Sequence, residues 1–169
     1  MTDVSRIIFL DIDGVLNSDS WNDMHQKEIR DGILIDEEKI KLLAILVKKT
    51  KAQIILHSGW RTWFNDDLKP LRIEAEKLAL MLAEEGLTLA GMTPDLTTEE
   101  IRRTKKFSLV KAKEILLWLK EYKDENAWVV LDDLDLHNVQ VEEHQVKTNK
   151  IIGLTLDDVM QAERILLVK

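Results

Sequence analysis

Two pairs of aspartates stand directly after apolar stretches of the sequence. Asp11 and Asp13 follow one apolar run, and Asp132 and Asp133 follow another. A carboxylate can attack phosphorus as a nucleophile, or pass a proton as a general acid and base. Crowded carboxylates need a counter-charge, and a hard divalent cation such as Mg²⁺ supplies it well. A turn or helix cap explains one such aspartate, but two pairs in equivalent places favour a catalytic or metal-binding site.

A serine follows a third apolar run. Ser58 and Gly59 come directly after residues 52–57. A hydroxyl and backbone amides at the start of a helix can hold a phosphoryl oxygen, although an ordinary N-cap serine has the same geometry. Arg61, in the same turn, can contact phosphate through its planar guanidinium or pair with an acidic residue. Both interpretations of Arg61 stay open.

One lysine is expected to face the carboxylates. At about 100° per residue, the helical pattern over residues 108–122 places Lys111 beside the apolar stripe and Lys113 in solvent. A buried ammonium needs an anionic partner, which the aspartates provide. Lys105 and Lys106, in the preceding loop, are the alternatives to Lys111.

The elements that must position these residues alternate between strand and helix patterns. Five strands are predicted, at residues 6–10, 52–57, 87–90, 127–131 and 145–148. Helical patterns cover residues 36–51, 60–85 with an interruption near Pro70, 108–122 with Ser108 as its cap, and the chain from Thr155 onward. This alternation predicts an α/β, Rossmann-like parallel sheet of about five strands with helices on both faces. Ligands of such sheets bind beyond the carboxyl ends of the strands, where the aspartate pairs and Ser58 should converge.

The domain organisation is expected to be simple. We interpret residues 1–169 as a single domain with a flap-like excursion at about residues 17–35, which show no strong period. Residues 62–106 have room only for a helix, a strand and a loop. No separate cap domain is therefore expected, and an open site can accept a bulky phosphoester.

Composition excludes several classes of protein. The 169 residues are 45% hydrophobic and 33% charged, with a formal net charge of −7. These values argue against a disordered chain, a membrane protein and a general nucleic-acid coat. There is no cysteine, and the first residues lack a secretory pattern, so we expect a cytoplasmic protein. Nothing in the sequence indicates an obligate protein partner.

Four motifs, in order, resemble those of the haloacid dehalogenase-like (HAD) phosphohydrolases. They are Phe9–Leu16, His57–Arg61, a lysine before the penultimate helix, and Leu131–Asp133. Further positions resemble a small subgroup whose members include phosphatase domains associated with RNA repair; these positions are Arg61, Glu114, Ile115, Trp118, Leu119 and Gly153–Thr155.

The resemblance implies a role for each motif residue. Asp11 would be the nucleophile that forms an aspartyl-phosphate, and Asp13 the general acid and then base. Ser58 would donate to a phosphoryl oxygen, and Lys111 would neutralise phosphate and nucleophile together. Gly14 permits the close backbone turn that phosphate needs.

The remaining implied contacts concern substrate and metal. Gly59 and Arg61 would contact the substrate beside Gly14. Mg²⁺ would be held by Asp11, the backbone carbonyl of Asp13, and the pair Asp132 and Asp133, with the direct ligand within that pair left open.

Several alternatives stay open. The substrate can be a phosphorylated small molecule or a nucleic-acid end, and a non-catalytic binding module with the same fold is a further possibility. The basic run at residues 102–106 is a solvated loop or a clamp for a phosphate-rich substrate. Trp60 and Trp63 could stack a base or pack in the interior.

Overall fold

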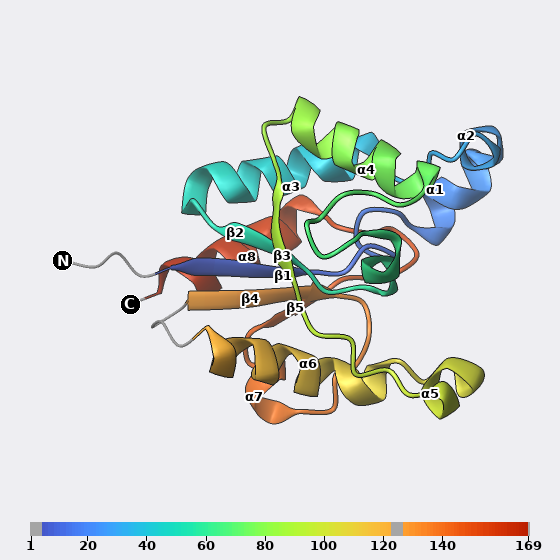
Figure 1. Cartoon of the computed structure of the whole chain (residues 1–169). Helices are drawn as coiled ribbons and strands as arrows, with labels where there is room; N and C mark the ends of the chain where they lie inside the picture. Colours follow the sequence, from blue (N-terminus) through green and yellow to red (C-terminus); the bar gives the residue numbers. More distant parts are fainter. Residues whose placement is uncertain (1–4, 123–126, 169) are drawn as a thin grey trace.

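The computed structural model describes residues 5–122 and 127–168 (Figure 1). Five strands pair in parallel in the order β3-β2-β1-β4-β5. Their bounds are β1 (Arg6–Leu10), β2 (Gln53–Leu56), β3 (Leu89–Met92), β4 (Ala127–Asp132) and β5 (Gln145–Lys147). The predicted α/β parallel sheet of five strands is thus confirmed, and the described residues form no separate cap domain.

Helices cover both faces of this sheet. The longer ones are α3 (Glu37–Thr50), α4 (Ile73–Glu84), α6 (Ser108–Glu121) and α8 (Leu156–Leu167). The shorter ones are α1 (Asp19–Met24), α2 (Gln26–Arg30), η1 (Gly59–Trp63), α5 (Glu99–Thr104) and α7 (Val139–Glu142). One apolar cluster joins the sheet to α3, α4 and α8, and a second joins it to α6 and α7. Figure 1 shows α6 and α7 below the sheet and α3 and α4 above it.

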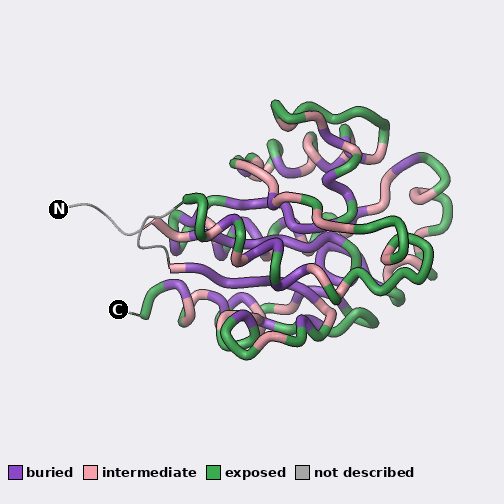
Figure 2. Tube along the Cα trace, turned by 60° about the horizontal axis from the view of Figure 1, so that its bottom comes forward, coloured by how far each residue is buried: buried purple, intermediate pink, exposed green. Residues whose placement is uncertain are grey.

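The middle strand is buried on both faces. In β1, Ile8 and Leu10 belong to the first apolar cluster, whereas Ile7 and Phe9 belong to the second. Successive side chains of a strand point to opposite faces, so an uninterrupted apolar run suits a strand between two helical layers. Figure 2 shows the buried strands through the centre of the molecule. This burial fixes the strand ends that carry the candidate site.

The helix predicted over residues 60–85 is wrong in its first half. The chain there forms η1 and an irregular stretch, and α4 begins only at Ile73. Within that stretch Phe64 forms an isolated antiparallel bridge with Pro70. Proline lacks an N–H and disfavours helix in the residue before it, which accounts for the late start of α4.

Two other boundaries differ from the prediction. The third strand begins at Leu89, because the Leu87 N–H instead donates to the Leu82 carbonyl and closes α4. The cap of α6 is Phe107, and Ser108 is already helical with no side-chain capping bond.

Short helices also lie where loops were predicted. They are α1 and α2 within residues 17–35, α5, which overlaps the basic run at residues 102–106, and α7 after β4. Helices of four to six residues are too short to show a periodicity.

Candidate active site

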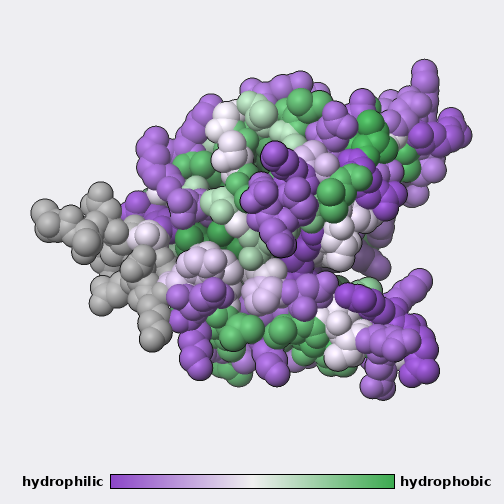
Figure 3. Space-filling model, in the orientation of Figure 1, coloured by the Kyte–Doolittle hydropathy of each residue, from purple (hydrophilic) through white to green (hydrophobic). Residues whose placement is uncertain are grey.

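Three neighbouring strands deliver the candidate residues to one cavity. Asp11 follows β1, Ser58 follows β2, and Asp132 and Asp133 lie at the end of β4. A cavity of about 630 Å³ opens there, and Asp11, Ser58, Lys111 and Asp133 are among its lining residues. In Figure 3 the molecule is notched between two hydrophilic projections that Figure 1 labels α1–α2 and α5. Residues of α1 and α5 line the same cavity.

Lys111 lies among the buried carboxylates. Its Nζ is 2.5 Å from Oδ2 of Asp132 and 3.4 Å from Oδ2 of Asp11. Lys113 is exposed, as the helical angles predict. Burial alone would lower the pKa of the Lys111 ammonium, but the two carboxylates outweigh it and raise that pKa. Lys111 is therefore positively charged in the folded protein.

The cavity floor holds more negative charge than Lys111 offsets. One carboxylate oxygen each of Asp11, Asp132 and Asp133 lie within 4.8 Å of one another. Burial raises the pKa of Asp11 well above its usual value, and the other aspartates raise it further against the effect of Lys111. Burial and the Asp132 charge likewise raise the pKa of Asp133. Three hard oxygen donors with one ammonium fit a divalent cation.

Asp132 and Asp133 have different surroundings. Asp132 is fully buried, and its Oδ1 accepts a hydrogen bond from the Leu134 N–H at 2.9 Å while Oδ2 faces Lys111. Asp133 is only half-buried and lines the cavity.

Gly14 packs directly against Asp133. A Cβ atom on Gly14 would lie 2.6 Å from Cγ of Asp133, and the backbone φ of +84° is in the left-handed region. A glycine is therefore required here on both counts.

Asn17 arranges the loop that follows β1. Its Oδ1 accepts the Gly14 N–H at 3.1 Å, and its Nδ2 donates to Oδ1 of Asp13 at 2.9 Å and to the Leu34 carbonyl at 3.0 Å. The Trp60 indole donates to the other Asp13 oxygen at 3.3 Å. The Asp13 side chain is thus exposed yet held by two donors.

Ser58 lines the cavity. It is buried, and its Oγ accepts a hydrogen bond from the Trp60 N–H at 3.2 Å. A hydroxyl that accepts one bond can still donate another. Gly59 is exposed beside it, with open space around the position of its missing Cβ. Ser58 therefore caps η1 and can also donate to a bound group.

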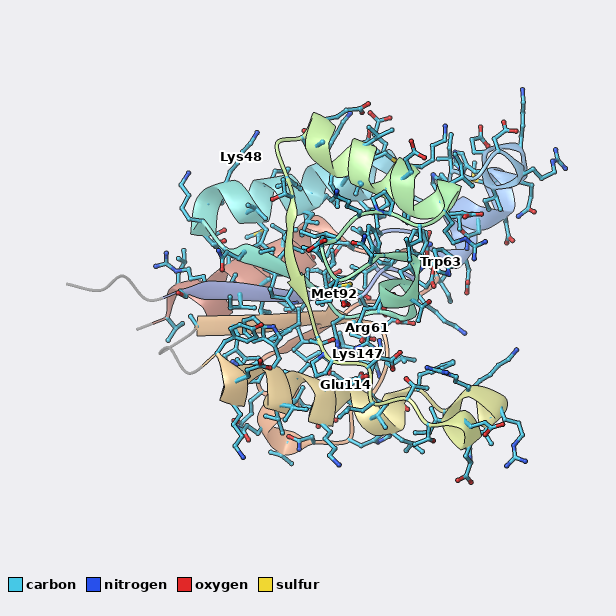
Figure 4. The ribbon with its side chains drawn as sticks, in the orientation of Figure 1. Lys48, Arg61, Trp63, Met92, Glu114 and Lys147 are labelled. Atoms are coloured by element: carbon cyan, nitrogen blue, oxygen red, sulfur yellow. The ribbon has the colours of Figure 1, made fainter. Side chains whose placement is uncertain are left out.

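Arg61 pairs with an acidic residue. Its Nη2 lies 3.0 Å from Oε2 of the fully buried Glu114, and Figure 4 shows the two side chains beside each other. Its other nitrogens donate to the Ser58 carbonyl, the Thr93 hydroxyl and the Pro94 carbonyl. The ion pair, one of the two interpretations left open, is thus present, and Arg61 also lines the cavity, so its contact with substrate stays a prediction.

The basic segment has one residue in the cavity wall. Arg102, at the end of α5, lines the cavity and lies 3.6 Å from Asp95. Lys105 and Lys106 are exposed, and the cavity lining does not include them. Lys150 is a further cation of the lining, which also includes Arg61 and Lys111.

Of the two tryptophans after Ser58, Trp60 packs in the interior and Trp63 is partly buried against it. Trp60 is buried, and its ring centroid is 4.6 Å from that of Trp63. The Arg72 guanidinium lies 4.2 Å above the Trp63 ring. Base stacking on Trp60 is excluded by its burial.

From the sequence, no role is expected for Asn17, and none for Glu114 beyond the resemblance. Each has a recognisable signal in retrospect. Asn17 lies three residues after Gly14, within reach of the turn it closes, and Glu114 lies one helical turn after Lys111 on the inward face of α6. The signal for Glu114 does not specify its partner Arg61, which comes from a distant part of the chain.

The fold is an α/β domain with clustered aspartates at the carboxyl ends of its parallel strands. The family described as "HAD domain in Swiss Army Knife RNA repair proteins" matches residues 7–159. The chain belongs to this family, which confirms the resemblance seen in the sequence. No curated protein and no solved structure matches the chain. In the part of the chain that the structure describes, no helix could span a membrane.

Proposed function

We propose that this domain is a Mg²⁺-dependent phosphomonoesterase that works through an aspartyl-phosphate at Asp11. The observation that carries the proposal is the contact of Lys111 with both Asp11 and Asp132 at one end of the sheet. A buried lysine beside a carboxylate nucleophile can neutralise an incoming phosphate. Membership of the HAD family supports the same class of reaction.

The reaction takes place in two displacements. An Asp11 oxygen attacks phosphorus while the bond from phosphorus to the leaving oxygen breaks, and Asp13 gives that oxygen its proton. Asp13, now a carboxylate, then takes a proton from water as the water oxygen attacks the same phosphorus. The bond to Asp11 breaks, which frees its carboxylate and inorganic phosphate.

Ser58 and Lys111 hold the phosphoryl group during both displacements. Ser58 donates its hydroxyl hydrogen to one non-bridging oxygen, and Lys111 offsets the charge that spreads over the others. Asn17 and Trp60 keep the Asp13 carboxylate directed at the leaving oxygen, because each donates to one of its two oxygens.

The aspartates fit the metal that the family uses. Asp11 and Asp133 would hold Mg²⁺ with the Asp13 carbonyl, while Asp132 would support the site from behind by fixing Lys111. When bound, Mg²⁺ would polarise the phosphoryl oxygen and reduce its repulsion from Asp11. The half-buried position of Asp133 in the cavity lining supports it as the direct ligand of its pair.

Nucleic-acid ends form the second candidate substrate class. Arg102 and Lys150 are exposed cations that line the same cavity as the aspartates. Two cations at the mouth of an open site can contact phosphates that neighbour the one removed. The family description, which names RNA repair proteins, supports the same class.

A phosphate-release assay tests both classes. The full chain is incubated with p-nitrophenyl phosphate, a panel of phosphorylated metabolites, and oligonucleotides phosphorylated at the 5′ or 3′ end, with Mg²⁺ or with EDTA. Mg²⁺-dependent release from any of them supports the proposal, and no release from all of them overturns it. Arg102→Gln with Lys150→Gln separates the classes, since it should weaken oligonucleotides and flatten their salt dependence while sparing p-nitrophenyl phosphate.

A further inference from the structure

The wall of the candidate active-site cavity contains a buried ion pair, between Arg61 and Glu114, that the proposed reaction does not use. Arg61 and Glu114 have side chains that are 7% and 0% exposed. Arg61 comes from η1, which follows β2, and Glu114 from the middle of α6 (Figure 4). The pair therefore bridges two segments that each carry a candidate phosphate-holding residue.

On the η1 side, Arg61 fixes the backbone of Ser58. Its Nε donates to the Ser58 carbonyl at 2.8 Å. Its Nη1 donates at 2.7 Å to the Thr93 hydroxyl, which also lies 2.7 Å from Nδ1 of His57. Ser58 is thus held through its own carbonyl and through the side chain of the residue before it.

On the α6 side, Glu114 holds the helix that carries Lys111. The two residues are three positions apart, so their side chains leave the same face of α6. Oε2 of Glu114 accepts from Arg61 and also from the Leu96 N–H at 2.8 Å. A shift of α6 would therefore break contacts with two separate loops.

We infer that Arg61 and Glu114 are positioning residues that set the spacing between the Ser58 hydroxyl and the Lys111 ammonium. This inference rests on the proposed function, in which Ser58 and Lys111 hold one phosphoryl group. Two donors on separate elements can grip one small anion only when those elements keep a fixed separation. The ion pair supplies a short link between them, with Ser58 bonded to one end and Lys111 one turn from the other.

Stability alone does not account for the pair. Burying two charges costs free energy that their attraction often fails to recover, and apolar side chains of similar volume are frequently as stable. Within the described residues, Oε1 of Glu114 is also buried without a hydrogen-bond partner, which lowers stability further. An apolar pair at these positions can therefore preserve the fold while removing the directional link.

The test compares two variants with a matched control. Arg61→Met/Glu114→Met removes the charges together, and Arg61→Lys keeps the charge but loses the planar fork that reaches Ser58 and Thr93. Leu43→Ala removes buried volume from α3, on the opposite face of the sheet, and controls for destabilisation. For each protein we would measure Tm, kcat and KM on p-nitrophenyl phosphate, and the Kd of tungstate with Mg²⁺, at a temperature well below every Tm.

A positioning role predicts that kcat and Tm separate. The double Met variant should keep a Tm near that of the wild type yet lose about 10²-fold in kcat, the scale for misplaced reacting groups. Arg61→Lys should lose at least about 10-fold in kcat and bind tungstate more weakly. Leu43→Ala should lose Tm with kcat unchanged.

Two results would overturn the inference. Wild-type kcat and tungstate affinity in both Arg61 variants would show that the link does not position the phosphate-holding groups. If the Arg61 variants lose no more kcat than Leu43→Ala does for the same loss of Tm, the pair has a structural role only. These results leave the proposed function intact; it fails separately if the wild type hydrolyses no phosphoester, and tungstate affinity then still tests the pair.

Discussion

The ammonium of Lys111 lies 2.5 Å from the carboxylate of Asp132; Lys111 belongs to α6, which packs on one face of the sheet, and Asp132 ends β4 within the sheet. This contact fixes the position of Lys111 relative to the end of β4. The other carboxylate oxygen of Asp132 accepts a hydrogen bond from the Leu134 N–H, so the Lys111–Asp132 pair is also bonded to the loop that follows β4. The contacts of Asp132 therefore hold the Lys111 ammonium close to the Asp11 carboxylate.

Asp11→Asn should abolish turnover and leave the fold unchanged. Asparagine keeps the shape of the side chain but cannot form the acyl phosphate. Removing one charge from the crowded carboxylates should also raise Tm in the absence of metal, because burial and neighbouring charges disfavour ionised Asp11. Phosphate release and thermal unfolding with EDTA check the two parts. Activity near that of the wild type would exclude a covalent intermediate at Asp11.

Lys111→Ala should lower kcat by about 10²-fold or more, the scale for removing one electrostatic stabiliser. It also leaves buried Asp132 without its cation, which should cost about 3 kcal/mol in the free energy of unfolding. Lys113→Ala is the matched control on the same helix and should stay within about 0.5 kcal/mol of the wild type. Urea unfolding and steady-state kinetics measure both effects. If Lys113→Ala is the impaired variant, the assignment of the counter-charge is wrong.

Gly14→Ala should lower the affinity for Mg²⁺, because the new Cβ must displace the Asp133 carboxylate. Gly86→Ala controls for backbone strain. It has a similar φ of +74° but nothing within 4 Å of the new Cβ, so both variants should lose about 1 kcal/mol of stability from the left-handed conformation. Only Gly14→Ala should need more Mg²⁺ for half-maximal activity. Equal Mg²⁺ requirements in the two variants would count against Asp133 as a ligand.

Asp133→Asn should raise the Mg²⁺ concentration for half-maximal activity by at least about 10-fold, since a ligand change costs no less than a change in its supporting residues. Asp135→Asn is the control, because Asp135 is exposed and pairs with Lys147 at 2.6 Å outside the cavity. Mg²⁺ should also raise the Tm of the wild type and of Asp135→Asn, but not that of Asp133→Asn. A Tm rise of the same size in all three would place the ion elsewhere.

His57 should make the protein sensitive to mild acid. Burial lowers the pKa of His57 well below its usual value, and the charges of Lys111 and Arg61 lower it further. The unfolded chain therefore takes up a proton below pH 6.5, about the usual value, while the folded protein does not. The free energy of unfolding should fall by up to about 1.4 kcal/mol for each pH unit below that point. Urea unfolding between pH 8 and pH 5 should show this slope in the wild type and a smaller one in His57→Gln. Identical slopes would assign the effect to other groups.

Much of the fold could be predicted, because it depends on patterns within single segments. The apolar run of β1, the N-cap of α3 at Asp36 and the capping box of Thr155 with Asp158 are local signals, and the structure contains each of them. Convergence of Asp11 and Asp132 followed from the general rule for parallel sheets.

The features that could not be predicted depend on contacts between distant residues. The partner of Arg61 could be an acid or a phosphate, and only the position of Glu114 on α6 separates these choices. The burial of Trp60 beneath the loop after β1 likewise depends on tertiary packing. Short helices such as α5 are set by their caps, here Thr98, whose signal is weak in a polar segment.

The strand order has a consequence for biosynthesis. β1 lies between β2 and β4, yet β4 is separated from it by most of the chain. During synthesis, β1 can pair with β2 early, but its other edge stays open until β4 leaves the ribosome. Such an apolar, unpaired edge favours association with other chains, and non-local pairing of this kind is slow. Lys111 and Asp132 also meet only when β4 pairs with β1, so the nascent chain exposes this edge before its candidate site is assembled.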